Sequence, residues 1–153
     1  MILGVNFVAK GVHLCVCGPV NGGFNLVTHE RFFVPATNDT LNKLDSLHTK
    51  IQDVVQLSNI RRIGLKVHYN LQSQHDLFNH GAPVGVLALV AEAHGCEFHS
   101  YTKRKLTSAK SFSLPKGTNV VDYVSNNFQD GSPHWQEPAK VAFLAAWAVE
   151  FGV

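Results

Sequence analysis

A basic segment in the last third of the chain is the clearest set of side chains with a possible chemical role. No acidic residue lies between Glu97 and Asp122, and hydroxyl side chains such as Thr107 and Ser108 are interleaved with the cations. Cationic side chains supply the largely sequence-independent part of nucleic-acid affinity, and hydroxyl groups add positioning contacts to phosphate. The pattern predicts a nucleic-acid-binding surface made of Lys103, Arg104, Lys105, Lys110 and Lys116.

Two aromatic residues, Tyr101 and Phe112, lie within or beside this segment. An aromatic ring in a basic groove can stack on an unpaired base, so either residue is a candidate for that contact. The alternative interpretation is a solvated loop, because short runs of basic residues are common on protein surfaces.

The nine histidines of the chain suggest a metal site, since imidazole is a frequent metal ligand. Their spacing matches no known ligand signature, because the sequence has no His-Glu-x-x-His helix and no Cys-x-x-Cys pair. We therefore predict no metal site and assign most histidines to surface or packing roles. Five of them are concentrated in the middle of the chain: His68, His75, His80, His94 and His99.

The cysteines and the amino terminus suggest a cellular compartment. Cys15 and Cys17 are two apart in an expected strand and Cys96 is distant, which suits core thiols in a reducing compartment better than a disulfide framework. The amino terminus lacks the pattern of a signal peptide, and no apolar run approaches the ~20 residues of a membrane span. These features predict a cytoplasmic protein without a membrane anchor.

Length and composition favour one compact domain over residues 1–153. A chain of 153 residues is long enough to bury a substantial core. Charged residues make up 16% of it and apolar residues 45%, which argues against disorder. The formal net charge of +2 is too small to indicate a nucleic-acid binder by itself, so the argument depends on local clusters.

The first third of the chain reads as three consecutive strands. Residues 2–9 and 12–17 are rich in β-branched and apolar residues and flank Lys10-Gly11, which predicts an antiparallel hairpin. Residues 24–34 alternate well enough to form a third strand, ended by Pro35. The three strands would form a meander.

Helical and strand patterns alternate in the rest of the chain. Asn38, Asp39 and Thr40 are good capping residues for a helix with apolar residues at helical spacing up to Val55. Strands are expected over 61–67 and 96–101, a loop over 69–81, and a central, fully buried helix over 83–94. Two more helices should follow, one capped by Thr118 or Asn119 and one opened by Pro138.

The resulting order, βββαβαβαα, is that of the ribonuclease-H-like fold, an α/β architecture with a mixed five-stranded sheet and helices on both faces. Leu3-Gly-Val-Asn6 resembles the opening strand motif of the RuvC-type resolvase branch, and Ile63-Gly-Leu-Lys-Val67 resembles its fourth strand. Residues 101–110 resemble the basic segment after the fifth strand, and residues 137–146 the acidic start of the last helix. The resemblance covers nearly the whole chain, and its strength lies in the order and spacing of these motifs.

Members of that family hold two divalent ions with four carboxylates, and the resemblance places these positions at Asn6, Lys66, Glu137 and Lys140. Only Glu137 is an acid. An asparagine can offer a carbonyl oxygen to a metal, but a lysine brings a positive charge where the metal would lie. The resemblance therefore implies a degenerate centre with no catalytic residues and no cofactor, unless Mg²⁺ serves a residual activity. The alternative is that Asn6, Lys66 and Glu137 have ordinary structural roles.

Three functions follow from these patterns. The preferred one is a non-catalytic module that binds DNA, RNA or a protein partner through the former active-site cleft and the basic segment. The second is a residual metal-dependent nuclease, using Glu137 with Glu92 or Asp122 and a histidine of the 69–81 loop. The third is a homodimeric scaffold, in which the apolar final helix and Trp147 are buried against a second subunit.

Overall fold

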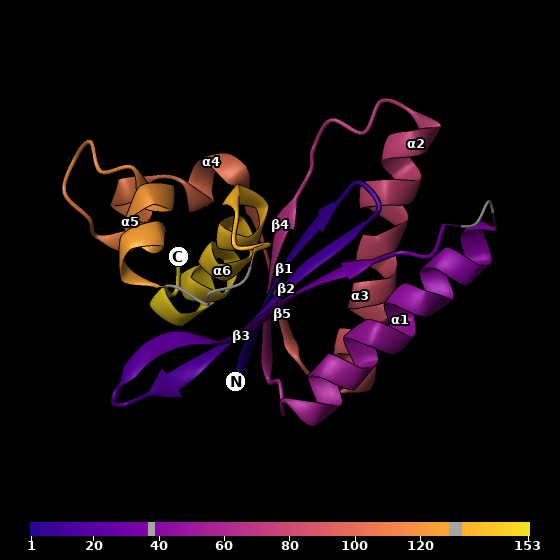
Figure 1. Cartoon of the computed structure of the whole chain (residues 1–153), viewed down its shortest axis with the longest axis horizontal. Helices are drawn as coiled ribbons and strands as arrows, with labels where there is room; N and C mark the ends of the chain where they lie inside the picture. Colours follow the sequence, from indigo (N-terminus) through magenta and orange to yellow (C-terminus); the bar gives the residue numbers. More distant parts are fainter. Residues whose placement is uncertain (37–38, 129–132) are drawn as a thin grey trace.

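The computed structural model describes residues 1–36, 39–128 and 133–153 and contains one mixed five-stranded sheet between two layers of helices (Figure 1). The strands are β1 (Ile2–Val8), β2 (Gly11–Val20), β3 (Gly23–Phe33), β4 (Arg62–Val67) and β5 (Glu97–Thr102). Their spatial order is β3-β2-β1-β4-β5. The first three strands are antiparallel neighbours, and β4 and β5 run parallel to β1, as the meander and the helical crossovers predict.

Helices cover both faces of the sheet. One face carries α1 (Thr40–Leu57) and α3 (Ala82–Ala93), and the other carries α6 (Glu137–Phe151) with α4 (Lys103–Leu106), a 3₁₀ turn (Ala109–Phe112) and α5 (Val120–Asn127) (Figure 1). Residues of β1 alternate between the two layers: Leu3 and Val5 join the core under α1 and α3, and Ile2 joins the core under α6. The α/β class with helices on both faces is confirmed.

Helix caps agree with the local sequence. Asp39 caps α1 by accepting from the backbone N–H of Leu41 and Asn42, and Asn119 caps α5 in the same way. Asn38, the other expected cap of α1, lies outside the described residues.

The prediction of a loop over residues 69–81 is wrong for the second half of that segment. Residues Gln74–Asp76 form a short helix, α2, which continues through a π turn (Leu77–Gly81) into α3. Ser73 and Asp76 form a capping box: the Ser73 hydroxyl accepts from the Asp76 N–H, and the Asp76 carboxylate accepts from the Ser73 N–H. This Ser-x-x-Asp pattern is the local signal that the composition of the segment obscured.

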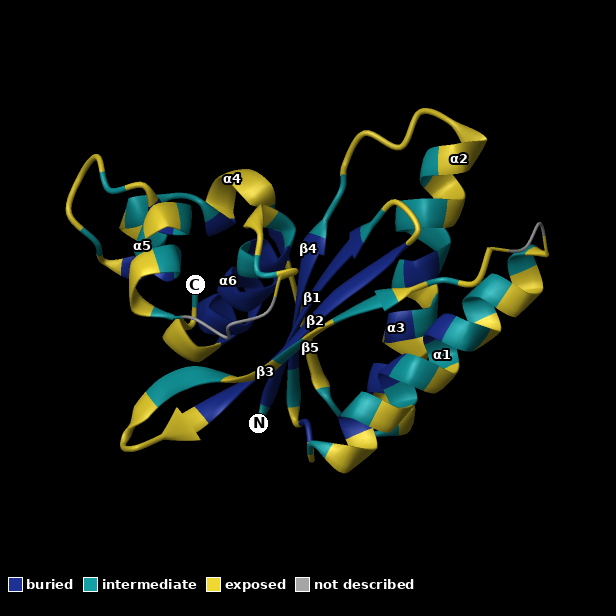
Figure 2. Cartoon of the chain, viewed as in Figure 1, coloured by how far each residue is buried: buried dark blue, intermediate teal, exposed yellow. Residues whose placement is uncertain are grey.

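The expectation of a fully buried helix over 83–94 is also wrong, because α6 has that position (Figure 2). Only one face of α3 is buried, and Leu89 is 69% exposed. Alanines allow α6 to lie close against the sheet, where Gly4 and Gly64 are paired on β1 and β4. A Cβ built at Gly4 would lie 1.9 Å from the Ala142 carbonyl oxygen, so this contact requires glycine.

The apolar surface of the last helix is covered within the chain. Trp147 is buried and stacks on Phe112, with their ring centroids 4.8 Å apart, and on Tyr123. The expectation that Trp147 is buried against a second subunit does not fit, because α5 and the preceding segment already cover that side chain, while a homodimer as such stays a prediction. Within the described residues, no helix is both long and apolar enough to cross a membrane.

Candidate functional site

A row of polar residues crosses the sheet at the carboxyl end of β1. Asn6 is paired with His13 on β2 and with Lys66 on β4, and the row continues to Arg31 on β3 and Tyr101 on β5. Directly paired residues point to the same face of a sheet, so these side chains share the face covered by α6. Asn6, His13 and Lys66 are only 5%, 2% and 9% exposed, and they are the buried polar residues of the described chain.

A cavity of about 260 Å³ lies beside this row, and residues of β1, β4, α4 and α6 line it. Asn6 and Lys66 come from the central strands, and Glu137 comes from the first turn of α6. Lys140, the fourth position implied by the resemblance, is half-buried in α6 and is not part of the cavity wall. The structure thus brings three of the four positions together, and Lys103 supplies a further charge.

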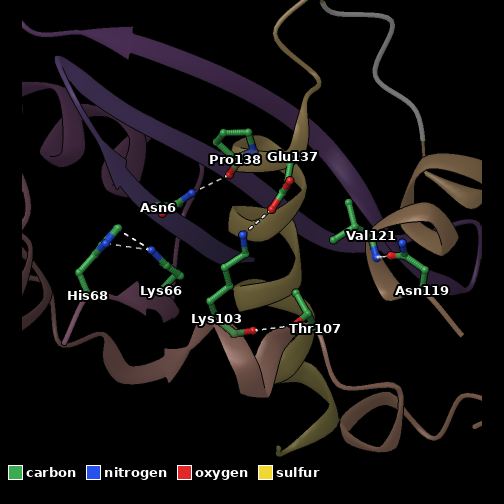
Figure 3. A network of polar contacts seen from close by, with 9 residues as sticks. All are labelled: Asn6, Lys66, His68, Lys103, Thr107, Asn119, Val121, Glu137 and Pro138. Carbon is green, nitrogen blue, oxygen red and sulfur yellow. Dashed lines mark hydrogen bonds and ion pairs between the residues drawn. The ribbon is translucent and has the colours of Figure 1, made fainter. Parts of the chain in front are cut away.

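Asn6 is held by the start of the last helix. Its side-chain amide donates to the Pro138 carbonyl oxygen at 2.9 Å, which connects β1 to α6 over a long sequence separation (Figure 3). The bond satisfies a buried donor and fixes the first turn of α6 beside the cavity. Asn6 therefore has a structural contact as well as a place in the wall.

Lys66 has an imidazole, not a carboxylate, as its polar neighbour. Its Nζ lies 2.6 Å from Nε2 of His68 (Figure 3). The same His68 nitrogen is 3.3 Å from the Phe7 carbonyl oxygen. No ion pair joins Lys66 to an acid of the described residues. Burial, together with the charge of Lys103, lowers the pKa of Lys66 to about 8.

The two histidines of the wall, His68 and His80, have lowered pKa values, which favours their neutral forms. His68 stacks on His80, with ring centroids 4.0 Å apart. Burial lowers the pKa of His68 to about 4, helped by the charges of Lys66 and His80, and burial followed by Lys66 lowers the pKa of His80. The sequence pointed to His68 and His80 among the central histidines, but it did not predict that the two rings stack in a cavity wall.

Glu137 is already engaged by a cation. Lys103 Nζ donates to its Oε1 at 2.5 Å, and the pair is exposed at the cavity mouth (Figure 3). This hydrogen bond and the charges of Lys103 and Lys140 hold the pKa of the Glu137 carboxyl below its usual value. With one carboxylate against Lys66 and Lys103, the cavity wall has a net charge of +1.

A pair of divalent metal ions does not fit these residues. The described residues contain no group of three His, Cys, Asp or Glu side chains able to hold a metal ion. Glu92 lies in α3 on the other face of the sheet, and Asp122 lies in the first turn of α5. Neither joins Glu137 at the cavity, so the carboxylate set expected for a residual nuclease is wrong.

The basic segment is divided between the cavity and the outer surface. Lys103 lines the cavity, while the other four cations are exposed outside it: Arg104, Lys105, Lys110 and Lys116. Tyr101 and Phe112 are buried, so the expectation that either ring stacks on a base is wrong. Leu106 and Phe112 instead anchor the segment in the core.

His13 is a buried polar residue that the sequence reading missed. Its Nδ1 lies 3.1 Å from His29 Nε2, and the two rings are stacked. Burial, followed by His29, Arg31 and His134, lowers the pKa of His13 to about 4. The available signal was its position in the apolar stretch of residues 12–17, which forms a strand buried on both faces.

Comparisons with known proteins find structures but no sequence relatives. No protein-family model and no curated protein matches the sequence. The RuvC structure of Thermus thermophilus matches with a TM-score of 0.79 at 11% identity, over 98% of this chain and 93% of that chain. The same protein in complex with a Holliday junction substrate has a TM-score of 0.76 at 10% identity, over 98% of this chain and 92% of that chain.

Two more distant structures match over nearly the whole chain. The yeast mitochondrial Holliday junction resolvase has a TM-score of 0.65 at 12% identity, over 99% of this chain and 76% of that chain. The fowlpox virus resolvase in complex with Holliday junction DNA has a TM-score of 0.55 at 11% identity, over 100% of both chains. These matches confirm the fold that the sequence resemblance predicted.

Proposed function

Since the chain has the ribonuclease-H-like fold of RuvC-type resolvases, we propose that it is a non-catalytic member of that fold that binds nucleic acid. The observation that carries the proposal is Lys66, a buried lysine at a position where the resembled nucleases have a carboxylate. A cation fixed there attracts a backbone phosphate and repels a divalent metal ion.

The electrostatics of the cavity favour an anion. Lys66 and Lys103 are close enough for their charges to oppose each other, since Lys103 contributes to the lowered pKa of Lys66. Glu137 offsets part of that charge from the mouth of the cavity. A phosphate between the two lysines would relieve their repulsion, which is a gain in free energy that a neutral ligand does not provide.

The exposed cations beside the cavity extend the same surface. Arg104 and Lys105 follow Lys103 directly in α4, and Lys110 follows in the next turn. Phosphates are spaced regularly along a nucleic-acid strand, so a phosphate in the cavity would bring its neighbours towards these side chains. Charge of this kind favours nucleic acid over the protein partner that the sequence left open.

Two of the matched structures contain a nucleic-acid ligand, which supports nucleic acid as the partner of this chain. One matched RuvC structure contains a Holliday junction substrate, and the matched fowlpox virus resolvase contains Holliday junction DNA. Four-way junctions are accordingly included with single strands and duplexes in the test.

The test is a fluorescence anisotropy titration of the full chain with labelled single-stranded, duplex and four-way junction DNA and with RNA, at fixed salt. Lys66→Gln should weaken binding by roughly tenfold. A titration repeated at several salt concentrations should also give a shallower decline of the logarithm of the binding constant with the logarithm of salt concentration, by about the amount that one phosphate contact contributes. The matched control is Lys50→Gln, on α1 at the other face, where Lys50 pairs with Glu30 at 2.6 Å. Equal loss in both variants, or no loss in Lys66→Gln, would overturn the proposal.

A triple variant of Lys103, Arg104 and Lys105 to glutamine separates the exposed surface from the buried lysine. Binding should weaken further than in Lys66→Gln, because three cations are removed. Circular dichroism of each variant verifies that the fold is retained. A triple variant that binds like the parent would exclude the α4 surface from the interface.

A further inference from the structure

A second and larger cavity lies on the other side of the β1–β2 turn. Its volume is about 500 Å³, and Val8 lines both cavities. The β1–β2 turn and residues 34–36 form one part of its wall, and the first turns of α1, the α2–π-turn segment and the start of α3 form the rest. The elements of its wall lie at the same end of the sheet as the candidate site, but on the face covered by α1 and α3 (Figure 1).

Most of its wall is apolar. The floor contains Leu47 and Pro83, which are buried, and Phe78 stands at the rim with 41% of its surface exposed. Val34 and Leu44 also line the cavity. Small-molecule sites have volumes of roughly 300–1,000 Å³ and a mainly hydrophobic wall with a few placed polar groups, and this cavity meets both conditions.

The charged groups of the wall have one sign. Lys10 and Lys43 are cationic, His75 is nearby, and the described wall contains no acid. The Lys10 backbone has φ 63° and its carbonyl accepts from the Val34 N–H at 2.9 Å, so the turn that carries this lysine is fixed. Asp39 precedes this end of α1, but its carboxylate accepts from the Leu41 N–H and is not part of the wall.

We infer that this cavity binds an organic anion with an aliphatic body, of the class of a medium-chain carboxylate. The apolar floor would take the body, and Lys10 and Lys43 would take the charged end at the rim. The wall is mainly aliphatic, and the Asn79 side-chain amide already donates to the His75 carbonyl oxygen at 2.9 Å. These features favour an aliphatic anion over a nucleotide, whose base edge requires hydrogen-bonding partners.

Titration calorimetry of the full chain with octanoate, decanoate, 1-octanol and adenosine monophosphate tests this inference. Decanoate should bind on the order of tenfold more tightly than octanoate, since each buried methylene contributes about fourfold. 1-Octanol should bind at least roughly tenfold more weakly than octanoate, because it lacks the charge that the lysines recognise. Lys43→Gln should weaken octanoate and leave 1-octanol unchanged.

The controls separate the cavity from the rest of the surface. Lys50→Gln on the same helix should bind octanoate like the parent, and Leu44→Trp should abolish binding by filling the cavity. If Leu44→Trp does not fold, the comparison of octanoate with 1-octanol in Lys43→Gln decides the matter. Equal binding of octanoate and 1-octanol would overturn the inference, as would tighter binding of adenosine monophosphate than of decanoate.

Discussion

Asn6 and Lys66 lie directly opposite each other on the parallel strands β1 and β4, at the centre of the polar row that crosses the sheet. Both are buried, and both face the start of α6. A carboxylate at each position would favour a cation beside Glu137, whereas the amide and ammonium groups present favour the anion that we propose. The charge of these two residues therefore determines which kind of ligand the fold can receive.

Glu137→Gln distinguishes a phosphate site from a residual nuclease. It removes the acid that engages Lys103, so nucleic-acid affinity should rise, by roughly two- to fivefold for an exposed ion pair. A nuclease that depends on Glu137 would instead lose chelator-sensitive cleavage of labelled DNA. Anisotropy titration and a cleavage assay with Mg²⁺ on the same preparation measure both quantities, and lower affinity together with lost cleavage would contradict our proposal.

Nucleic-acid affinity should decrease as the pH rises through about 8. The pKa of Lys66 is lowered to about 8 by burial and then by Lys103, so in the free protein this lysine loses its proton at moderately alkaline pH. A bound phosphate favours the protonated form, which makes binding weaker above the pKa. Titrations between pH 7.0 and 9.5 measure this effect.

Lys66→Arg is the control for that pH dependence, because an arginine remains charged over the whole range. Its affinity should stay nearly constant between pH 7.0 and 9.5. The same decline in Lys66→Arg as in the parent would assign the effect to another group.

His13 should make the protein less stable in mild acid. Its pKa is lowered from 6.5 to about 4, mainly by burial, so between these values the unfolded chain binds a proton that the folded chain does not. The free energy of unfolding should fall as the pH drops through this window, by roughly 3 kcal/mol at most for this group. Urea denaturation at several pH values should give a shallower decline for His13→Gln, and an unchanged decline would contradict the assignment.

Gly4→Ala should strongly destabilise the fold. The added Cβ would meet the Ala142 carbonyl oxygen at 1.9 Å, so α6 has to move off the sheet, at a cost of roughly 3 kcal/mol or more. Gly85→Ala is the matched control, since an added Cβ on this exposed position of α3 meets no atom within 4 Å. It should stabilise the helix by up to about 1 kcal/mol. Thermal denaturation compares the two, and similar melting temperatures would contradict the close contact of α6.

Local patterns in the sequence determined the order of strands and helices and two of the helix caps. The β-branched and apolar composition of β1 and β2, the turn at Lys10-Gly11 and the capping residues Asp39 and Asn119 act over a few residues, so they can be read without a structure. The short motifs around Asn6 and Lys66 also carried the family resemblance, which implied that these two positions lack a carboxylate. These are properties of residue type and of short-range spacing.

The tertiary structure alone decided which side chains meet. The register between β2, β1 and β4 places His13, Asn6 and Lys66 in one row, and the position of α4 brings Lys103, not Lys140, to the cavity. It also decided that α6 is the buried helix and that a second cavity forms beside the β1–β2 turn. Such contacts depend on pairing and packing between segments that are distant in the sequence. The local periodicity of a segment does not specify which distant segment it meets.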